Sequence, residues 1–501
     1  MKNSNNLFLF LFLFLLLALC TTGAYFKFHK NHEDIPIGCD EFGYMSLAKA
    51  FDEGTTYQEH VKRPYLPALL DTLRHQGITE REIQWLVVPH AYYVVPGTNQ
   101  IINQYPPGTS WVLSWIPLAF RQVSFPGIAM FLFLLFPSLA LFLTHKEPWP
   151  GALLILMIFT FYATLSTPIL NEFTRINSLA FTFGLLIAAG ILLKNKPLLS
   201  CLLIALSANF RLVNVLLLLP LLFFVPAQLK ITRQNILLWF KLGWKYLLII
   251  TLALSPYIIY MYRLRGNPLL PTYASNDTAL NTNVLSNIRF YFDPLEGLFQ
   301  LHLIAIALLF VLFLYNKISI KAFFSLLAFP LLNYLFFIFH QVQMNYYPYA
   351  SFFILFGFLL NHFDLKSWTY NRPKTAKLFC LVLALAILTD GIISYHSQSH
   401  KTFETAQNEY KALCSYQIVW GELLPSASEY VCKNNGFKFS TSTSRARKIT
   451  MQFLFQKHYP QLFILKDIPD NGMMVKEEIK QAGLPFQQIS DKNFGDLLII
   501  R

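Results

Sequence analysis

The sequence predicts an all-α polytopic membrane protein with about 11–12 transmembrane helices and a small α/β domain at the C-terminal end. Of its 501 residues, 54% are hydrophobic and only 13% are charged, whereas soluble domains carry about 25% charged residues. Long apolar runs recur along the chain, and many Phe and Tyr residues lie in them or at their ends, as is typical of a membrane–water interface. Residues 396–501 lack such runs and are predicted to form a separate soluble domain.

The formal net charge of +13 comes from Lys and Arg residues that are spread between the apolar runs. Nucleic-acid binding would favour a single basic stripe, so we do not expect a nucleic-acid partner. Positive charge in short loops is typical of the cytoplasmic side of a membrane protein. The same charges would also attract anionic lipid head groups.

The first apolar run, Leu7 to Tyr25, follows Lys2 and predicts a first transmembrane helix over residues 1–25. A cleaved signal peptide is the alternative. The run is long for that role and no small-x-small cleavage site follows it cleanly. We therefore expect an uncleaved span with its N-terminus in the cytoplasm.

Residues 26–108 are polar and predict an extracytoplasmic loop with two amphipathic helices. Apolar residues recur at helical spacing in each: Tyr44, Leu47, Ala48 and Phe51, and then Leu66, Leu69, Leu70 and Leu73. One apolar face suits a helix that lies on the membrane surface. Ordinary packing inside a folded loop would produce the same pattern, and the sequence leaves both open.

Residues 109–395 predict the polytopic membrane domain. The segment Thr109 to Phe120 is too short to span comfortably and is interpreted as a juxtamembrane helix. With that assignment the loops rich in Lys and Arg fall on the inner side, except for the loop 263–297, and the chain crosses eleven times. The further runs lie at about 126–144, 151–168, 176–193, 198–208, 212–225, 240–262, 298–316, 320–339, 346–362 and 376–395.

One part of this count is open. The stretch 198–225 is interpreted as two short helices around Asn209-Phe210-Arg211, and a single kinked helix is the alternative. A single helix would change the number of crossings by one and move the C-terminal domain to the other side of the membrane.

The C-terminal domain, residues 396–501, contains two predicted strands, Gln461–Lys466 and Asp496–Arg501, and a predicted helix over Thr450–His458. A disulfide between Cys414 and Cys432 is compatible with an oxidising compartment, but their separation alone does not establish it. The cysteines and histidines show no metal-ligand spacing.

Asp40 and Glu41 are the leading candidates for chemistry. They open the first amphipathic helix, where the helix dipole stabilises a carboxylate, so a purely structural role competes with a functional one. A carboxylate at the outer membrane surface is also suited to act as a general base. Nearby, Tyr105 precedes Pro106-Pro107-Gly108, which fixes the start of a helix.

Glu172 and Arg175 lie between two spans on the predicted outer side, where charged residues are costly and often functional. Arg211 interrupts an apolar run and needs an anionic partner, for which a lipid phosphate or an internal carboxylate would serve. Further candidates for substrate binding are Tyr105, Lys62, Arg63 and Asn267, the last in an outer loop that begins Arg265-Gly266-Asn267-Pro268.

The order of these parts resembles the GT-C integral membrane glycosyltransferases, in particular the protein O-mannosyltransferase and lipid A aminoarabinose transferase branch. The resemblance rests on Asp40-Glu41-Phe42-Gly43-Tyr44 after the first span, on Tyr105-Pro106-Pro107-Gly108, and on Glu172, where that branch usually has Asp. Arg211 in a later span, the Gly-Asn-Pro loop and the soluble extracytoplasmic tail also fit. The resemblance covers about residues 1–395.

This resemblance implies transfer of a sugar from a polyprenyl phosphate to an acceptor that is a lipid glycan, a saccharide or a protein. It implies that Asp40 is the catalytic base, that Glu41 and Glu172 orient a substrate, and that Arg211 contacts the donor phosphate. The late outer loop reads Asn345-Tyr346-Tyr347-Pro348 and lacks the Arg that members often carry there. A metal requirement varies within this fold, and the sequence shows no ligand cluster.

The resemblance also implies a bacterial inner membrane location, with the endoplasmic reticulum as the alternative. The charge of the loops and the eleven crossings predict that the C-terminal domain is on the outer side, which is the periplasm in bacteria. Two other functions are compatible with a polytopic chain. A transporter or flippase would usually show internal repeats, and none is found here. A non-catalytic subunit of a glycan-assembly complex would use the outer loop and the tail to bind partners, and it would tolerate loss of the Asp40 carboxylate.

Overall fold

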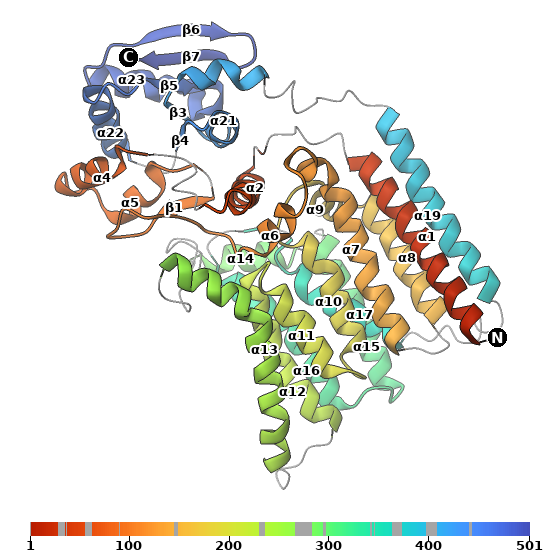
Figure 1. Ribbon diagram of the computed structural model, residues 1–501. Coiled ribbons are helices and arrows are strands. Elements are labelled where there is room, and N and C mark those ends of the chain that lie inside the picture. The colour runs from red at the N-terminus through yellow and green to blue at the C-terminus, as the bar shows by residue number, and fades with distance from the viewer. Residues whose placement is uncertain are drawn as a thin grey trace. The chain divides into compact units, whose positions relative to one another are not determined.

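The computed structural model describes most of the chain, and its elements are labelled in Figure 1. The described residues form two compact units. The helical unit comprises Met1–Asn31, Val123–Leu269 and Asp277–Gln398, and the mixed unit comprises His32–Gln122, Leu270–Asn276 and Ser399–Arg501. Within these spans the structure describes residues 2–28, 36, 38–55, 63–89, 91–144, 149–229, 236–265, 283–293, 297–340, 343–344, 346–362, 373–396, 408–439 and 443–501.

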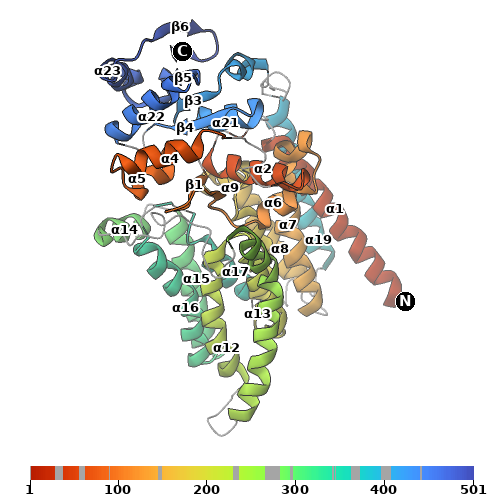
Figure 2. The same ribbon diagram turned by 60° about the vertical axis from the view of Figure 1, so that its left-hand side comes forward.

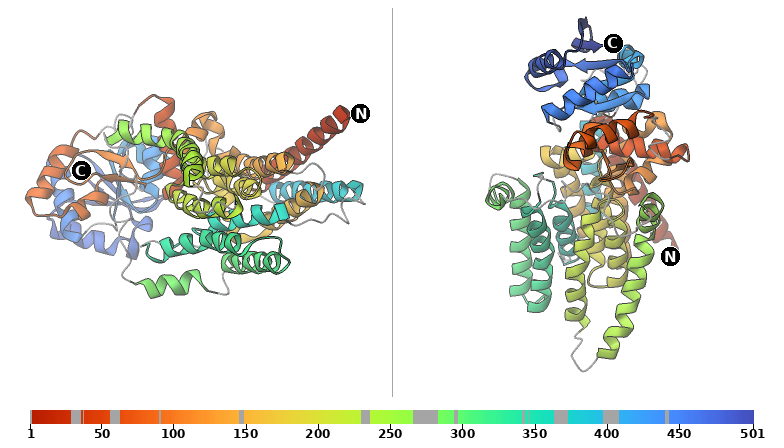
Figure 3. Two further views of the ribbon diagram at one scale, coloured as in Figure 1. Left: turned by 90° about the horizontal axis from the view of Figure 1, so that it is seen from below. Right: turned by 90° about the vertical axis from the view of Figure 1, so that its left-hand side faces the viewer.

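The helical unit consists of apolar helices that run roughly along one common direction (Figures 1 and 3). Five described helices are long and apolar enough to cross a membrane, and six shorter ones are also apolar. The described helices are α1 (Lys2–Phe28), α7 (Arg121–Thr144), α8 (Trp149–Leu165), α9 (Thr167–Thr174), α10 (Ala180–Leu192), α11 (Pro197–Ser207), η3 (Leu212–Leu217), α12 (Leu218–Leu229), α13 (Ile236–Arg265), α14 (Val284–Tyr291), α15 (Gly297–Leu314), α16 (Ile320–Ile338), α17 (Tyr349–His362) and α19 (Pro373–His396). The predicted polytopic all-α architecture is confirmed, and this is an integral membrane protein.

The first and last of these helices, α1 and α19, pack side by side and point the same way (Figure 1). Near their starts, the Lys377 ammonium lies 5.1 Å from the ring centroid of Phe8. Near their ends, Lys27 donates a hydrogen bond to Asp390. Because the two helices run in the same direction, the chain leaves the helical unit at the same end after α1 and after α19.

The stretch 198–225 is broken at the predicted place. Helix α11 ends at Ser207, a turn covers Ala208 to Phe210, and Arg211 has an extended backbone before η3 and α12 begin. The two-helix interpretation is therefore confirmed.

Glycines bring α1 and α19 into backbone contact. A Cβ atom added at Gly391 would lie 2.2 Å from the carbonyl oxygen of Gly23, and one added at Gly23 would lie 2.7 Å from the carbonyl oxygen of Ile387. Small residues at such crossings let two backbones approach closely, which drives helix association in a membrane. The tight α1–α19 contact therefore depends on the absence of side chains at these positions.

We predict that Gly391→Ala destabilises the helical unit by about 1–3 kcal/mol, because the added methyl group overpacks the α1–α19 contact. Gly243→Ala in α13 is the matched control, since a Cβ there meets no atom within 4 Å and alanine favours helix over glycine. Thermal unfolding in detergent checks this. Equal melting temperatures for the two variants would contradict the prediction.

The mixed unit is built around a five-stranded sheet in the order β4-β3-β5-β7-β6. Strands β3 (Ile418–Gly421), β4 (Asn435–Lys438) and β5 (Gln461–Ile464) are parallel to one another. Strand β7 (Gly495–Ile500) is antiparallel to both of its neighbours, β5 and β6 (Gln487–Asp491). Helices α21 (Leu424–Cys432), α22 (Ser444–Gln456) and α23 (Met473–Gln481) connect the strands (Figure 1). The predicted α/β character of the tail is confirmed, and Cys414 and Cys432 form a disulfide.

The same unit contains the elements that follow the first span. They are α2 (Cys39–Asp52), α4 (Leu66–His75), α5 (Glu80–Leu86), the hairpin of β1 (Tyr92–Val94) and β2 (Ile101–Asn103), α6 (Gly108–Ser114) and η2 (Leu118–Phe120). Both predicted amphipathic helices are present as α2 and α4. Their apolar faces are buried: α2 packs against α21 and α4 packs against α22. Packing within a folded domain thus accounts for their amphipathic pattern.

A buried ion pair joins the loop to the tail. The Arg63 guanidinium donates to Glu429 at 2.6 Å and to the carbonyl oxygen of Val87 at 2.8 Å. Glu429 also accepts the backbone N–H of Gly436 at 2.8 Å. The side chains of Arg63 and Glu429 are only 3% and 1% exposed, so water contributes little to their solvation.

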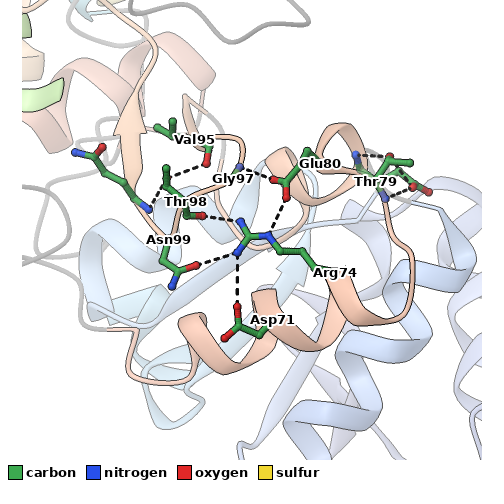
Figure 4. Close-up of polar contacts among 10 residues, drawn as sticks. Asp71, Arg74, Thr79, Glu80, Val95, Gly97, Thr98 and Asn99 are labelled. Atoms are coloured by element: carbon green, nitrogen blue, oxygen red, sulfur yellow. Dashed lines mark hydrogen bonds and ion pairs between the residues drawn. The ribbon is translucent and has the colours of Figure 1, made fainter. Parts of the chain in front are cut away.

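A second arginine stabilises the loop near its surface (Figure 4). Arg74 donates to Glu80 at 2.8 Å and to the carbonyl oxygen of Thr98 at 2.7 Å. Glu80 in turn accepts the N–H of Gly97 at 3.0 Å. These contacts tie α4 and α5 to the turn of the β1–β2 hairpin, with Arg74 and Glu80 25% and 36% exposed.

We predict that Arg63→Met destabilises the mixed unit by about 3–5 kcal/mol, because it leaves the Glu429 carboxylate buried without its counter-charge. Arg74→Met should cost about 1 kcal/mol or less, because its ion pairs are exposed and screened by salt. Thermal unfolding at low and high salt checks both. The prediction would be contradicted if added salt reduced the loss of unfolding free energy as much for Arg63→Met as for Arg74→Met.

Candidate active site

Asp40 lies in the first turn of α2 and is held by Tyr105. The Tyr105 hydroxyl donates to Asp40 Oδ1 at 2.7 Å, and Gln104 Nε2 donates to the same hydroxyl oxygen at 3.0 Å. The Cys39 thiol lies 3.0 Å from the Tyr105 hydroxyl. Tyr105 is 8% exposed, so its bond fixes the direction of the half-buried Asp40 carboxylate.

The protonation states in this cluster follow from burial and charge. Burial and then the negative charge of Asp40 raise the pKa of the Cys39 thiol to about 12. The same two causes, in the same order, raise the pKa of the Tyr105 hydroxyl well above its usual value. Near neutral pH both groups keep their protons, so Tyr105 acts as a donor to Asp40 and Cys39 is a poor nucleophile.

Gly43 makes room for this arrangement. A Cβ atom at Gly43 would lie 2.7 Å from the Tyr105 ring and 2.5 Å from Cβ of Ala91. Asn103 fixes the same region, since its Nδ2 donates to the carbonyl oxygen of Gly43 at 2.8 Å. Its Oδ1 accepts the N–H of Tyr105 at 2.8 Å. The glycine of the Asp-Glu-Phe-Gly-Tyr segment is therefore explained by the close approach of the Tyr105 ring to α2.

The other predicted residues of the mixed unit have different positions. Glu41 is half-buried in the first turn of α2, beside Asp40. Arg63 forms the ion pair with Glu429 described above, so its predicted contact with substrate stays a prediction. Lys62 and Asn267 lie outside the described residues.

Glu172 lies on α9 in the helical unit, a short helix that the sequence analysis did not predict. The side chain is buried, and Oε2 accepts a hydrogen bond from Asn177 Nδ2 at 2.6 Å. Asn177 Oδ1 accepts the N–H groups of Leu179 and Ala180, both at 2.9 Å. Glu172 thus orients the amide that binds the first N–H groups of α10, while Arg175, just after α9, is exposed.

The backbone at Arg211 is fixed by its neighbour Asn209. Asn209 Nδ2 donates to the carbonyl oxygen of Ala253 at 2.7 Å, and Oδ1 accepts the N–H of Tyr257 at 3.2 Å. These two backbone groups lie four residues apart in α13, on either side of Pro256. The Asn209 amide therefore connects the turn after α11 to the part of α13 that contains the proline.

Three aromatic rings surround the Arg211 guanidinium, which is buried at 7% exposure. Its central carbon lies 4.6 Å from the ring centroid of Tyr347, 5.6 Å from that of Phe337 and 5.8 Å from that of Tyr346. Aromatic faces attract a cation but carry no formal negative charge. The rings therefore orient the guanidinium.

Several members of these clusters were not predicted. Cys39, Gln104, Asn177 and Asn209 were missed as partners, although an Asn just before an apolar helix is a recognisable cap signal for Asn177. The late outer loop was noted only for the Arg that it lacks, and the contact of its tyrosines with Arg211 was not foreseen. Among the described residues no group of three or more His, Cys, Asp or Glu side chains is placed to hold a metal ion.

The solved structures that resemble this chain include ArnT from Cupriavidus metallidurans in two states. The form bound to undecaprenyl phosphate superposes with a TM-score of 0.51 at 10% identity, covering 98% of this chain and 98% of that chain. The apo form gives a TM-score of 0.54 at 9% identity and covers 99% of this chain and 98% of that chain. No protein-family model matches the sequence, and no curated protein matches it. At this identity the likeness concerns the fold, and the predicted GT-C-like fold is confirmed.

Proposed function

We propose that this protein is a glycosyltransferase that moves a sugar from a polyprenyl-phosphate donor to an extracytoplasmic acceptor. The observation that carries the proposal is the Asp40 carboxylate, aligned by the Tyr105 hydroxyl at the start of α2, in a chain that shares the fold of ArnT over almost its whole length. The solved ArnT with undecaprenyl phosphate bound supports a polyprenyl lipid as the donor carrier.

In this reaction Asp40 acts as the general base. It removes the proton from an acceptor hydroxyl or amine as that group attacks the anomeric carbon of the donor sugar. The bond between the anomeric carbon and the phosphate oxygen breaks, and polyprenyl phosphate leaves with the electron pair. Tyr105 keeps the carboxylate in one orientation, which matters because a base must meet the proton within hydrogen-bond distance.

The leaving phosphate needs positive charge, and Arg211 is our choice for this contact. The three aromatic rings orient its guanidinium, and a guanidinium matches the geometry of a phosphate. Arg175, being exposed, is a second candidate. Glu41 and Glu172 are proposed to orient acceptor or donor, and Lys62, Arg63 and Asn267 remain predicted substrate contacts.

The Cys414–Cys432 disulfide supports a tail in an oxidising compartment. With the loop after α1 leaving the helical unit at the same end as the tail, Asp40 would face that same compartment. We therefore propose a bacterial inner membrane protein with its N-terminus in the cytoplasm and the mixed unit in the periplasm.

We predict that Asp40→Asn lowers turnover by about 10²-fold or more, as expected for loss of a general base, while the protein stays folded. Purified protein is offered a panel of undecaprenyl-phosphate sugars and candidate acceptors, and mass spectrometry measures released undecaprenyl phosphate. The control is Asp71→Asn, which removes a carboxylate whose side chain is 64% exposed on α4 and should leave turnover unchanged. Full turnover by a folded Asp40→Asn variant would contradict the assignment of Asp40 as the general base.

We predict that Tyr105→Phe lowers turnover about tenfold, because Asp40 loses a charge-assisted hydrogen bond of about 1.5–3 kcal/mol and with it a fixed orientation. The same release assay measures this. Tyr430→Phe, which removes a buried hydroxyl elsewhere in the same unit, serves as control. A Tyr105→Phe enzyme as fast as the control would show that the bond does not position the base.

A further inference from the structure

A buried histidine in the helical unit belongs to none of the groups considered so far. His302 on α15 is 1% exposed. Its Nε2 lies 3.1 Å from Ser351 Oγ on α17, and its Nδ1 lies 3.2 Å from the Tyr334 hydroxyl on α16. The imidazole thus bridges two helices that flank the outer loop around Tyr346 and Tyr347.

The hydrogen bonds from Tyr334 through His302 and Ser351 to Pro348 have a consistent direction. Ser351 donates its hydroxyl proton to the carbonyl oxygen of Pro348 at 2.9 Å, and with the proton in that position the hydroxyl oxygen accepts from His302 Nε2–H. A neutral imidazole then has an unprotonated Nδ1, which accepts the Tyr334 hydroxyl proton. One tautomer therefore gives each polar hydrogen in the chain a partner.

Both ends of this series of hydrogen bonds, Tyr334 and Pro348, reach the aromatic rings at Arg211. Tyr334 packs in one buried cluster with Tyr291 and Phe337, and Tyr347 packs against that cluster. At the other end, Pro348 directly follows Tyr347, whose ring stacks on Phe337 at a centroid distance of 4.5 Å. A shift of Tyr334 or of Pro348 would therefore move a ring that contacts the guanidinium.

A second clamp holds the same loop from α14, which lies beside α16 (Figure 2). Asn287 Nδ2 donates to the carbonyl oxygens of Ile338 and His340, both at 2.7 Å. Asn287 Oδ1 accepts from Gln343 at 2.6 Å. The end of α16, which carries Phe337, is thereby fixed, and His302 contacts the other end of the loop through Ser351.

We propose that His302 is a positioning residue for Arg211: through Tyr334 and Ser351 it fixes the rings of Phe337 and Tyr347 against which the guanidinium lies. The inference rests on the proposed function, in which Arg211 contacts the donor phosphate. His302 itself touches no substrate and transfers no proton. Its removal lowers the affinity for a polyprenyl phosphate by letting the guanidinium change direction.

The test is a double-mutant cycle on full-length protein in detergent, with undecaprenyl phosphate as the probe and native mass spectrometry titration as the readout. His302→Leu is expected to weaken binding about tenfold in the wild-type background and to have little effect in the Arg211→Ala background. A general structural defect would instead lower binding equally in both. His362→Leu, on α17 away from this loop, is the matched control and should bind as the wild type does.

Variants that delete one hydroxyl keep the test valid if His302→Leu does not fold. Tyr334→Phe and Ser351→Ala are each expected to weaken binding several-fold, again only when Arg211 is present. Wild-type affinity in His302→Leu, or equal losses in the two backgrounds, would overturn this inference alone. Absence of binding to the wild type, or full binding to Arg211→Ala, would overturn the proposed phosphate contact and this inference with it.

Discussion

The hydrocarbon core of a membrane supplies no water to solvate polar groups, and this constraint explains the most informative contacts of the helical unit. Three polar side chains that interrupt apolar helices meet partners within the protein. Asn209 hydrogen-bonds to two backbone groups of α13. Glu172 orients the residue that caps α10, and His302 connects α15 to α16 and α17. Each satisfied group also fixes a segment next to a candidate functional residue.

The mixed unit must be assembled from segments that come from opposite ends of the chain. Hydrophobic packing of α2 on α21 and of α4 on α22 brings them together. The Arg63–Glu429 pair then specifies how they fit, since a buried charge tolerates few alternative positions. The Asp40 cluster forms within the same unit, so the orientation of the proposed base depends on a scaffold that the loop does not build alone.

Much of the fold could be predicted from the sequence, because apolar run length and loop charge report directly on a bilayer. The break at Asn209-Phe210-Arg211 was foreseen for the same reason. The helix α9 and the β1–β2 hairpin were missed because they are short and lack clear periodicity. In the site, Asp40 and Arg211 stood out as charges in unusual places. Tyr105 was a candidate as well, but its bond to Asp40 and the contact of Tyr347 with Arg211 were not predicted. The partners are 65 and 136 residues apart in the sequence, and only the fold brings them close.

The ion pair between Arg63 and Glu429 has a consequence for the synthesis of this protein. The two residues are 366 positions apart, so at about 5–20 residues per second the ribosome adds Glu429 roughly 20–70 s after Arg63. During that interval the strand that carries Phe437, whose ring lies 6.2 Å from the ring of Tyr65 in the finished unit, has not been made. Final folding of a segment near the start of the chain therefore waits for the last span to insert. A chain that stops before residue 429 would keep this segment unfinished and open to proteases, so the state of the loop reports whether the whole protein has been made.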